Sequence, residues 1–76
     1  MNISEQARIF GYLQPKGFKM RDSGPEKLIF EKGTAIITIL NNPKSLPVRI
    51  KTIDETLSYT AREFNDLMDY LEVNVK

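Results

Sequence analysis

The sequence predicts an α+β fold, α-β-β-β-β-α, in which a four-stranded antiparallel sheet has two helices packed on one face. Two amphipathic segments, residues 2–13 and 58–73, lie near the ends of the chain. Between them, short segments alternate apolar and charged residues and are separated by Gly- and Pro-containing turns. Strands grouped together between helices are typical of α+β domains.

Residues 2–13 form the predicted first helix. Asn2 followed by Glu5 has the spacing of a capping box, in which each side chain accepts a hydrogen bond from the other residue's backbone N–H. Apolar residues then recur at helical spacing. The stripe expected to face the core consists of Ile3, Ala7, Phe10 and Leu13.

Four segments are predicted as strands, at residues 18–22, 27–31, 34–40 and 48–53. The Lys32-Gly33 pair is expected to close a tight hairpin between the second and third of them. The third, "TAIITIL", is apolar on both faces and has no charge over seven positions. A strand of that composition belongs in the centre of a sheet.

The final helix is expected to begin at Thr60. Thr60 with Glu63 has capping-box spacing, and Tyr59 with Phe64 occupies the positions of a hydrophobic staple. The expected core stripe of this helix is Phe64, Leu67, Met68 and Leu71.

Composition limits the chemistry that the chain can perform. With 76 residues, 41% hydrophobic and 28% charged, residues 1–76 are predicted to form a single small globular binding domain. Cys and His are both absent, which excludes disulfides, zinc sites built on thiolate or imidazole ligands, and cysteine nucleophiles. Acid-base catalysis would need strongly shifted pKa values that so small a core can hardly produce. We expect no enzyme activity, no metal and no cofactor.

Targeting signals are not visible in the sequence. The longest mainly apolar run, "AIITIL", is far shorter than the roughly 20 residues that span a bilayer. The first residues, "MNISEQ", have neither the charged nor the apolar region of a signal peptide. We expect a cytoplasmic protein that does not bind membranes.

Basic residues are concentrated before the final helix. Through Lys51 the chain has nine Lys or Arg and four Asp or Glu, whereas two and six follow. Strand alternation places several of these cations on the face opposite the predicted core, which indicates either a cationic binding face or solvated surface. This candidate basic face consists of Lys19, Arg21, Lys27, Arg49 and Lys51.

The back of the final helix is the second candidate surface. At 100° per residue, Tyr70 and Val73 fall near 240° and 180° from Phe64, where a solvated helix should be polar. Either Tyr70 lies over a neighbouring loop or the C-terminal tail while Val73 marks the fraying helix end, or both contact a partner. The candidate protein interface consists of Asp66, Asp69, Tyr70 and Val73.

Two known outlines resemble this arrangement. Four short strands followed by "LSYTAREFNDLMDYL" resemble the single-stranded-DNA-binding domains of the transcriptional positive-cofactor type, from which the N-terminal helix departs. Double-stranded-RNA-binding domains have a similar order of elements, but their second helix opens with a Lys-rich segment where this chain has "AREFND". We assign neither family.

The sequence therefore predicts a non-enzymatic binding module. A domain this small buries only about 60% of the surface that its unfolded chain exposes, and no disulfide or metal is encoded. We therefore expect a homo-oligomer, in its simplest closed form a homodimer. Small stand-alone proteins of this kind occur among phage, mobile-element and bacterial accessory or inhibitory proteins, which act by contact with another protein. The alternative function is single-stranded nucleic-acid binding, including ssDNA, through the basic face, and a small-ligand-sequestering oligomer is a third.

Overall fold

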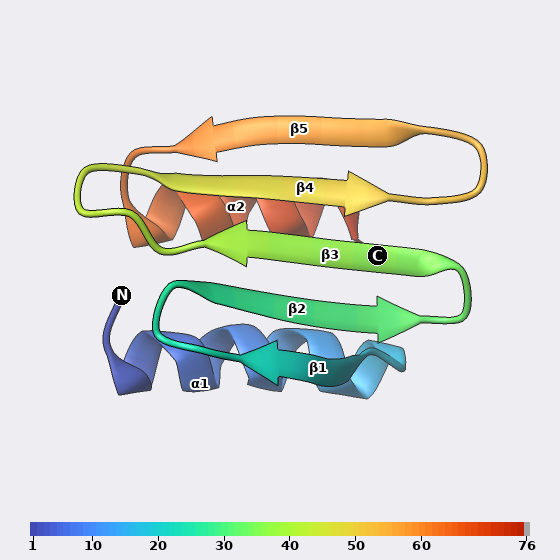
Figure 1. Cartoon of the computed structure of the whole chain (residues 1–76), viewed down its shortest axis with the longest axis horizontal. Helices are drawn as coiled ribbons and strands as arrows, with labels where there is room; N and C mark the ends of the chain where they lie inside the picture. Colours follow the sequence, from blue (N-terminus) through green and yellow to red (C-terminus); the bar gives the residue numbers. More distant parts are fainter. Residues whose placement is uncertain (76) are drawn as a thin grey trace.

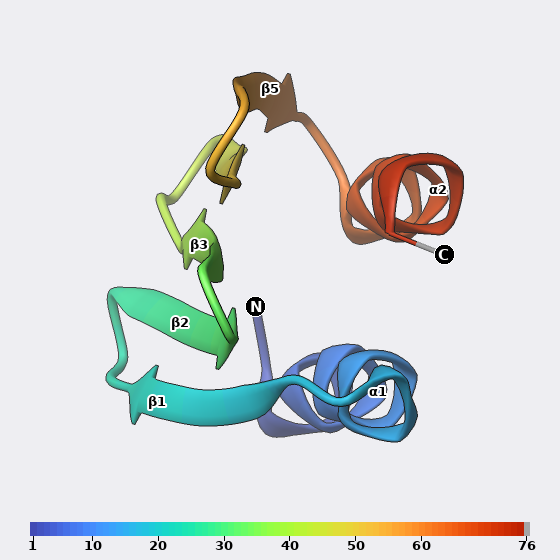
Figure 2. The ribbon, with the colours of Figure 1, turned by 90° about the vertical axis from the view of Figure 1, so that its right-hand side faces the viewer.

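A computed structural model describes residues 1–75 and contains two α-helices and five strands. The strands form one antiparallel meander in the order β1-β2-β3-β4-β5 (Figure 1). Both helices lie on the same side of the sheet (Figure 2). The predicted α+β class is confirmed, and the predicted number of four strands is wrong. The elements are α1 (Ile3–Leu13), a 3₁₀ turn (Gln14–Lys16), β1 (Lys19–Ser23), β2 (Lys27–Lys32), β3 (Ala35–Leu40), β4 (Leu46–Lys51), β5 (Thr56–Ala61) and α2 (Phe64–Asn74).

The strand that the prediction missed is β5. Tyr59 and Thr60, expected to staple and cap the final helix, instead pair with Val48 and Pro47 of β4. The helix begins three to four residues later, at Phe64, and its N-cap residue Glu63 makes no side-chain capping hydrogen bond. Pairing with β4 satisfies the backbone N–H and C=O groups of alternate residues along β5, which outweighs the single capping interaction expected at Thr60.

The predicted capping box of α1 is confirmed, and the predicted set of core-facing residues is partly wrong. The Glu5 N–H donates to Asn2 Oδ1 at 2.8 Å, and the Asn2 N–H donates to Glu5 Oε1 at 2.9 Å. The buried residues are Ile9 and Leu13, whereas Ile3 is 85% exposed. At 100° per residue Ile3 lies about 120° from Ile9, so it cannot face the core when Ile9 does.

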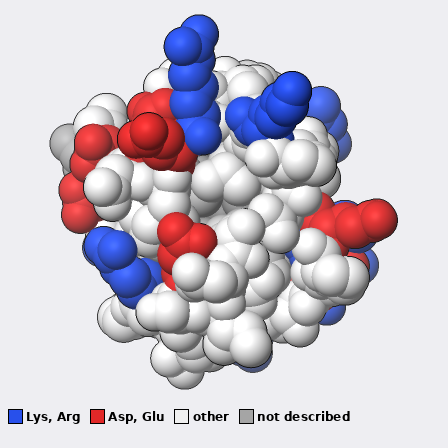
Figure 3. Space-filling view, turned by 90° about the vertical axis from the view of Figure 1, so that its left-hand side faces the viewer, with Lys and Arg blue, Asp and Glu red and all other residues white. Residues whose placement is uncertain are grey.

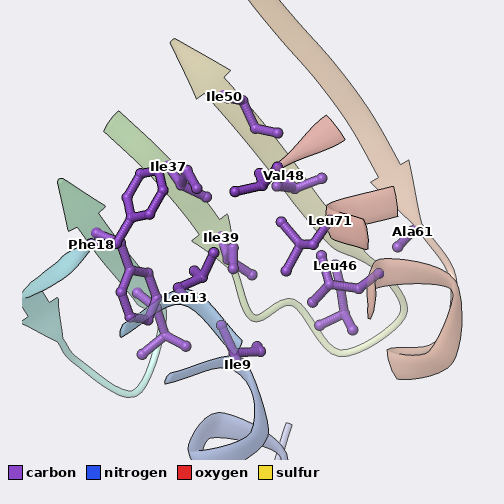
Figure 4. Packing of buried hydrophobic residues seen from close by; sticks show 14 residues of the cluster. Ile9, Leu13, Phe18, Ile37, Ile39, Leu46, Val48, Ile50, Ala61 and Leu71 are labelled. Carbon is purple, nitrogen blue, oxygen red and sulfur yellow. The ribbon is translucent and has the colours of Figure 1, made fainter. Parts of the chain in front are cut away.

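The inner layer between sheet and helices is filled by apolar side chains. Figure 4 shows side chains from β3 and β4 pointing toward those of both helices. Among the described residues 1–75, no polar or charged residue is buried. The largest fully buried side chains are Phe30, Ile9, Leu13, Leu28, Ile37, Ile39, Leu67 and Leu71.

The two helices are also linked to each other. The Tyr12 hydroxyl of α1 donates to the backbone oxygen of Val75 at 2.8 Å, immediately beyond α2. The Arg8 guanidinium lies over the Phe64 ring, 5.0 Å from its centroid, in a cation–π contact. These contacts hold the helices on the inner face and leave the opposite face of the sheet uncovered (Figure 2).

Candidate binding faces

The outer face of the sheet is the side without helices. In β2 and β4 the side chains alternate between buried and accessible positions, with Leu28, Phe30, Val48 and Ile50 turned to the core. The intervening residues therefore form the outer face. All five residues of the predicted basic face are exposed: Lys19, Arg21, Lys27, Arg49 and Lys51.

Strand register determines the neighbours of these cations. Arg49 lies opposite Thr38, and Lys51 lies opposite Ile36, so both flank the central strand β3. Lys27 lies opposite Leu40 on the other side of β3. The cations of β2 and β4 therefore flank the outward side chains of β3, which are Ile36, Thr38 and Leu40.

Among residues 1–75, one of the five cations of the basic face forms an ion pair. Arg21 lies at the irregularity between Met20 and Asp22, where β1 departs from regular pairing with β2. Its guanidinium forms an ion pair with Glu31 at 3.3 Å, with the two side chains 60% and 42% exposed. An ion pair this exposed contributes little to stability, about 0–1 kcal/mol. Within residues 1–75 the other four cations of the face form no ion pair, so they remain available to an anionic partner.

A hollow of about 440 Å³ lies on this face over β2 to β5. Ile29, Leu40 and Pro47 give it an apolar lining, and the cations Lys27 and Arg49 also line it. Thr38, Ser58 and Thr60 add hydroxyl groups. Its volume is within the range of ligand-binding clefts. Its apolar residues could contact an apolar group of a ligand, and its two cations could contact acidic groups on either side of that group.

Pro47 is compatible with this position in β4 although β4 is an internal strand. The pairing of β4 with β3 ends at Val48 opposite Ile39, immediately before Pro47, which has no N–H to donate to a ladder. The proline ring adds apolar surface to the hollow.

No aromatic side chain contributes a ring to the outer face among residues 1–75. Phe18 and Phe30 are buried, and Tyr59 faces α2. The remaining rings, Phe10, Tyr12, Phe64 and Tyr70, belong to the helices. Base stacking, which supplies much of the affinity for single strands, therefore has no platform there.

Two of the four residues of the predicted interface on α2 contact β5, and the other two are exposed. The Tyr70 ring stacks on the Tyr59 ring, with centroids 4.6 Å apart and planes inclined by 7°. The Tyr59 hydroxyl donates to Asp66, 2.7 Å from Oδ1 and 2.9 Å from Oδ2. Asp69 and Val73 are exposed, with Val73 at 69%. Tyr70 and Asp66 therefore have partners within the chain. These partners could not be predicted without β5, because Tyr59 belongs to that strand.

Asp66 also orders the start of α2. Its Oδ2 accepts the Arg62 N–H at 3.3 Å, and its charge lies in the first turn, where the helix dipole favours an anion. The hydrogen bond to Asp66, followed by desolvation and the Asp66 charge, raises the pKa of Tyr59 above its ordinary value. The same carboxylate thus joins β5 to the helix that follows it.

The Tyr59–Asp66 contact predicts a pH dependence. Because the pKa of Tyr59 is raised on folding, its stabilising contribution is complete below the ordinary tyrosine pKa of 10.0 and is lost as pH rises toward the folded-state pKa. In a titration of phenolate absorbance, we expect a tyrosine transition above the ordinary pKa of 10.0. Tyr59→Phe should remove that transition, and Asp66→Asn should move it to lower pH. A raised transition that persists in Tyr59→Phe would contradict the assignment.

A second, smaller hollow lies at the end of the molecule where α2 begins. Its volume is about 220 Å³, and Glu5, Lys44, Arg62 and Glu63 contribute charges of both signs. Figure 3 views this end, where basic and acidic groups are interspersed on a mostly uncharged surface. It therefore has less charge selectivity than the outer face.

Metal-ligand groups are limited in the part of the chain that the structure describes. Among residues 1–75, no three Cys, His, Asp or Glu side chains are placed to hold a metal ion. Within the same residues, no helix has the length and apolar character needed to cross a membrane.

Comparisons with known proteins do not assign a family. No protein-family model matches the chain, and neither the curated proteins nor the solved structures include a significant match.

Proposed function

We propose that this protein is a non-enzymatic binding module that contacts another protein through the outer face of its sheet. The observation that carries the proposal is the hollow on that face, which combines apolar Ile29 and Leu40 with the cations Lys27 and Arg49. The partner that fits this chemistry is an acidic segment that carries an apolar side chain. By binding such a segment of its partner, this protein would act as an accessory or inhibitory protein.

An acidic peptide with a central leucine provides a direct probe. Its binding to the protein can be followed by fluorescence anisotropy of a label on the peptide. Ile29→Thr should weaken binding because it removes apolar area from the hollow while keeping a β-branched residue in β2. Retained affinity in Ile29→Thr would argue against a protein partner at this hollow.

Charge reversal tests the cationic part of the same face. Arg49→Glu combined with Lys51→Glu should change the free energy of unfolding by no more than about 0.5 kcal/mol, because both side chains are exposed. The double variant should bind the acidic peptide at least about tenfold more weakly, which corresponds to about 1.4 kcal/mol. Lys44→Glu, an exposed charge reversal outside the outer face, is the matched control and should bind normally. Equal weakening by Lys44→Glu would mean that only net charge matters.

Single-stranded nucleic acid is the alternative partner, because four cations of an open sheet face form no ion pair within residues 1–75. The lack of an outward aromatic ring makes it the second choice. An oligothymidylate distinguishes the two functions. A nucleic-acid binder should bind it with an affinity that falls steeply with salt and is indifferent to Ile29→Thr. A protein binder should prefer the acidic peptide and depend on Ile29.

A further inference from the structure

Strand β5 ends the sheet on a bare edge. It is the last strand in the order β1-β2-β3-β4-β5, and its six residues, "TLSYTA", contain no charge, Pro or Gly. Figure 2 shows α2 on the inner side of the sheet, with the edge of β5 uncovered by either helix. A regular, uncharged edge strand is a template for pairing with another strand.

The opposite edge is protected in the ways that disfavour such pairing. Strand β1 has five residues, its register with β2 shifts between Met20 and Asp22, and it carries Lys19, Arg21 and Asp22. Short length, a bulge and charges are the features by which natural sheets block edge pairing. The two edges of this sheet therefore differ in their capacity to accept a strand.

The backbone groups on the free edge of β5 can be assigned from the β4–β5 hairpin. The Thr52 N–H donates to the Glu55 oxygen at 2.8 Å, and hydrogen-bonded pairs alternate along an antiparallel ladder from that point. The pairs Ile50–Leu57 and Val48–Tyr59 then exchange hydrogen bonds. The N–H and C=O groups directed away from β4 consequently belong to Thr56, Ser58 and Thr60.

We propose that β5 pairs antiparallel with β5 of a second copy of this chain, about a two-fold axis at Ser58. In this register Ser58 meets Ser58 of the second copy, and Thr56 meets Thr60, so every free backbone group of these residues finds a partner. The result is a closed dimer with a continuous ten-stranded sheet. This inference does not rest on the proposed function, because it uses the backbone groups at the edge of the sheet and not the apolar or cationic side chains of the hollow.

Side chains in this register are complementary. On the outer face, hydroxyl residues meet hydroxyl residues, and on the inner face Leu57 meets Tyr59 of the second copy. Aromatic–aliphatic and Thr–Thr pairs across strands are favourable, and no like charges oppose each other within β5. Tyr59 is 38% exposed in the single chain, so it has surface left to cover.

Charges beyond the strand ends favour the same arrangement. The two-fold register, continued past β5, brings Asp54 to the level of Arg62 of the second copy, and the reverse contact follows by symmetry. Both residues are exposed. Opposite charges therefore meet at both ends of the paired strands, which supports a second copy as the occupant of this edge.

Light scattering after size exclusion at micromolar concentration tests the dimer. The unaltered protein should have twice the 8.8 kDa mass of the chain. Ser58→Lys places two like charges at the axis and should raise the dimer dissociation constant at least about tenfold. Ser4→Lys, the same change at an exposed residue of α1, should remain dimeric. A monomeric unaltered protein, or a Ser58→Lys variant that remains as dimeric as Ser4→Lys, overturns the proposal.

Single cysteines test the register, since the chain has none of its own. Ser58→Cys places two thiols on residues whose Cα atoms are about 5.5 Å apart, within disulfide range. Thr56→Cys leaves its two thiols four residues apart along the strand, about 13 Å. Oxidation should link Ser58→Cys dimers and leave Thr56→Cys unlinked, whereas a mixture of Thr56→Cys and Thr60→Cys should form linked heterodimers. Equal linking of Ser58→Cys and Thr56→Cys alone would refute this register.

Discussion

Ile9→Ala should destabilise the protein by about 2–5 kcal/mol, whereas Ile3→Ala in the same helix should change stability by about 0.5 kcal/mol or less. Ile9 is fully buried against the core, and its truncation leaves a cavity as well as lost apolar contact. Ile3 is 85% exposed, so its truncation removes little packing. Chemical denaturation of both variants measures the difference.

The size of this effect follows from the size of the domain. A 76-residue chain has a total stability of the order of 4–11 kcal/mol at about 0.05–0.15 kcal/mol per residue. Loss of the Ile9 side chain can therefore remove a large part of it. Equal destabilisation by the two substitutions would show that α1 faces the sheet with a different side, and Ile9→Val, expected to cost about 0.5–1.5 kcal/mol, provides a milder variant that should still fold.

Leu57→Pro should be strongly destabilising, by about 2–4 kcal/mol, and Ser58→Pro should be tolerated. The Leu57 N–H belongs to the β4–β5 ladder, so proline removes a sheet hydrogen bond and leaves an acceptor on β4 without its donor. The Ser58 N–H points to the free edge, where proline is compatible with a strand. Denaturation midpoints at low protein concentration give the comparison, with circular dichroism as the check of folding.

This proline pair also distinguishes β5 from the helix that the sequence predicted there. If residues 56–61 were an irregular segment leading into a helix, the two adjacent substitutions would have similar, small effects. Similar effects would therefore contradict the strand.

Strand β5 is absent from the predicted strands because its residues contain both a strand pattern and a helix-start pattern. Alternation of Leu57, Tyr59 and Ala61 with Thr and Ser has the period of a strand, and it was available in the sequence. Thr60 and Glu63 also have capping-box spacing, which predicts a helix start at Thr60. Pairing with β4 decides between them, and long-range pairing is not visible in a local pattern.

The same failure explains the prediction about Tyr70. The rotation of α2 relative to Phe64 placed Tyr70 on a solvent-facing side, but the fully buried residues are Leu67 and Leu71. Measured from Leu67, Tyr70 lies about 60° away and reaches β5, where it stacks on Tyr59. Without knowledge of β5, the sequence could not provide this neighbour.

The outer face was easier to predict because it depends on alternation alone. Once Leu28, Phe30, Val48 and Ile50 face the core, the intervening cations must face outward. The hollow on that face could not be predicted, since it depends on how β2, β3, β4 and β5 lie side by side. Local patterns thus located the charged residues, and the sheet register supplied their apolar neighbours.

Chemical-shift mapping can locate the surface at which the proposed acidic segment would bind. Isotope-labelled protein is titrated with the acidic leucine peptide, and the shifts of backbone amides are assigned to strands and helices. We expect the largest changes in β2, β3 and β4 around Ile29, Leu40 and Arg49, and we expect them to be lost in Arg49→Glu/Lys51→Glu. Changes confined to α2 around Asp69 and Val73, or the same changes in the double variant, would contradict this prediction.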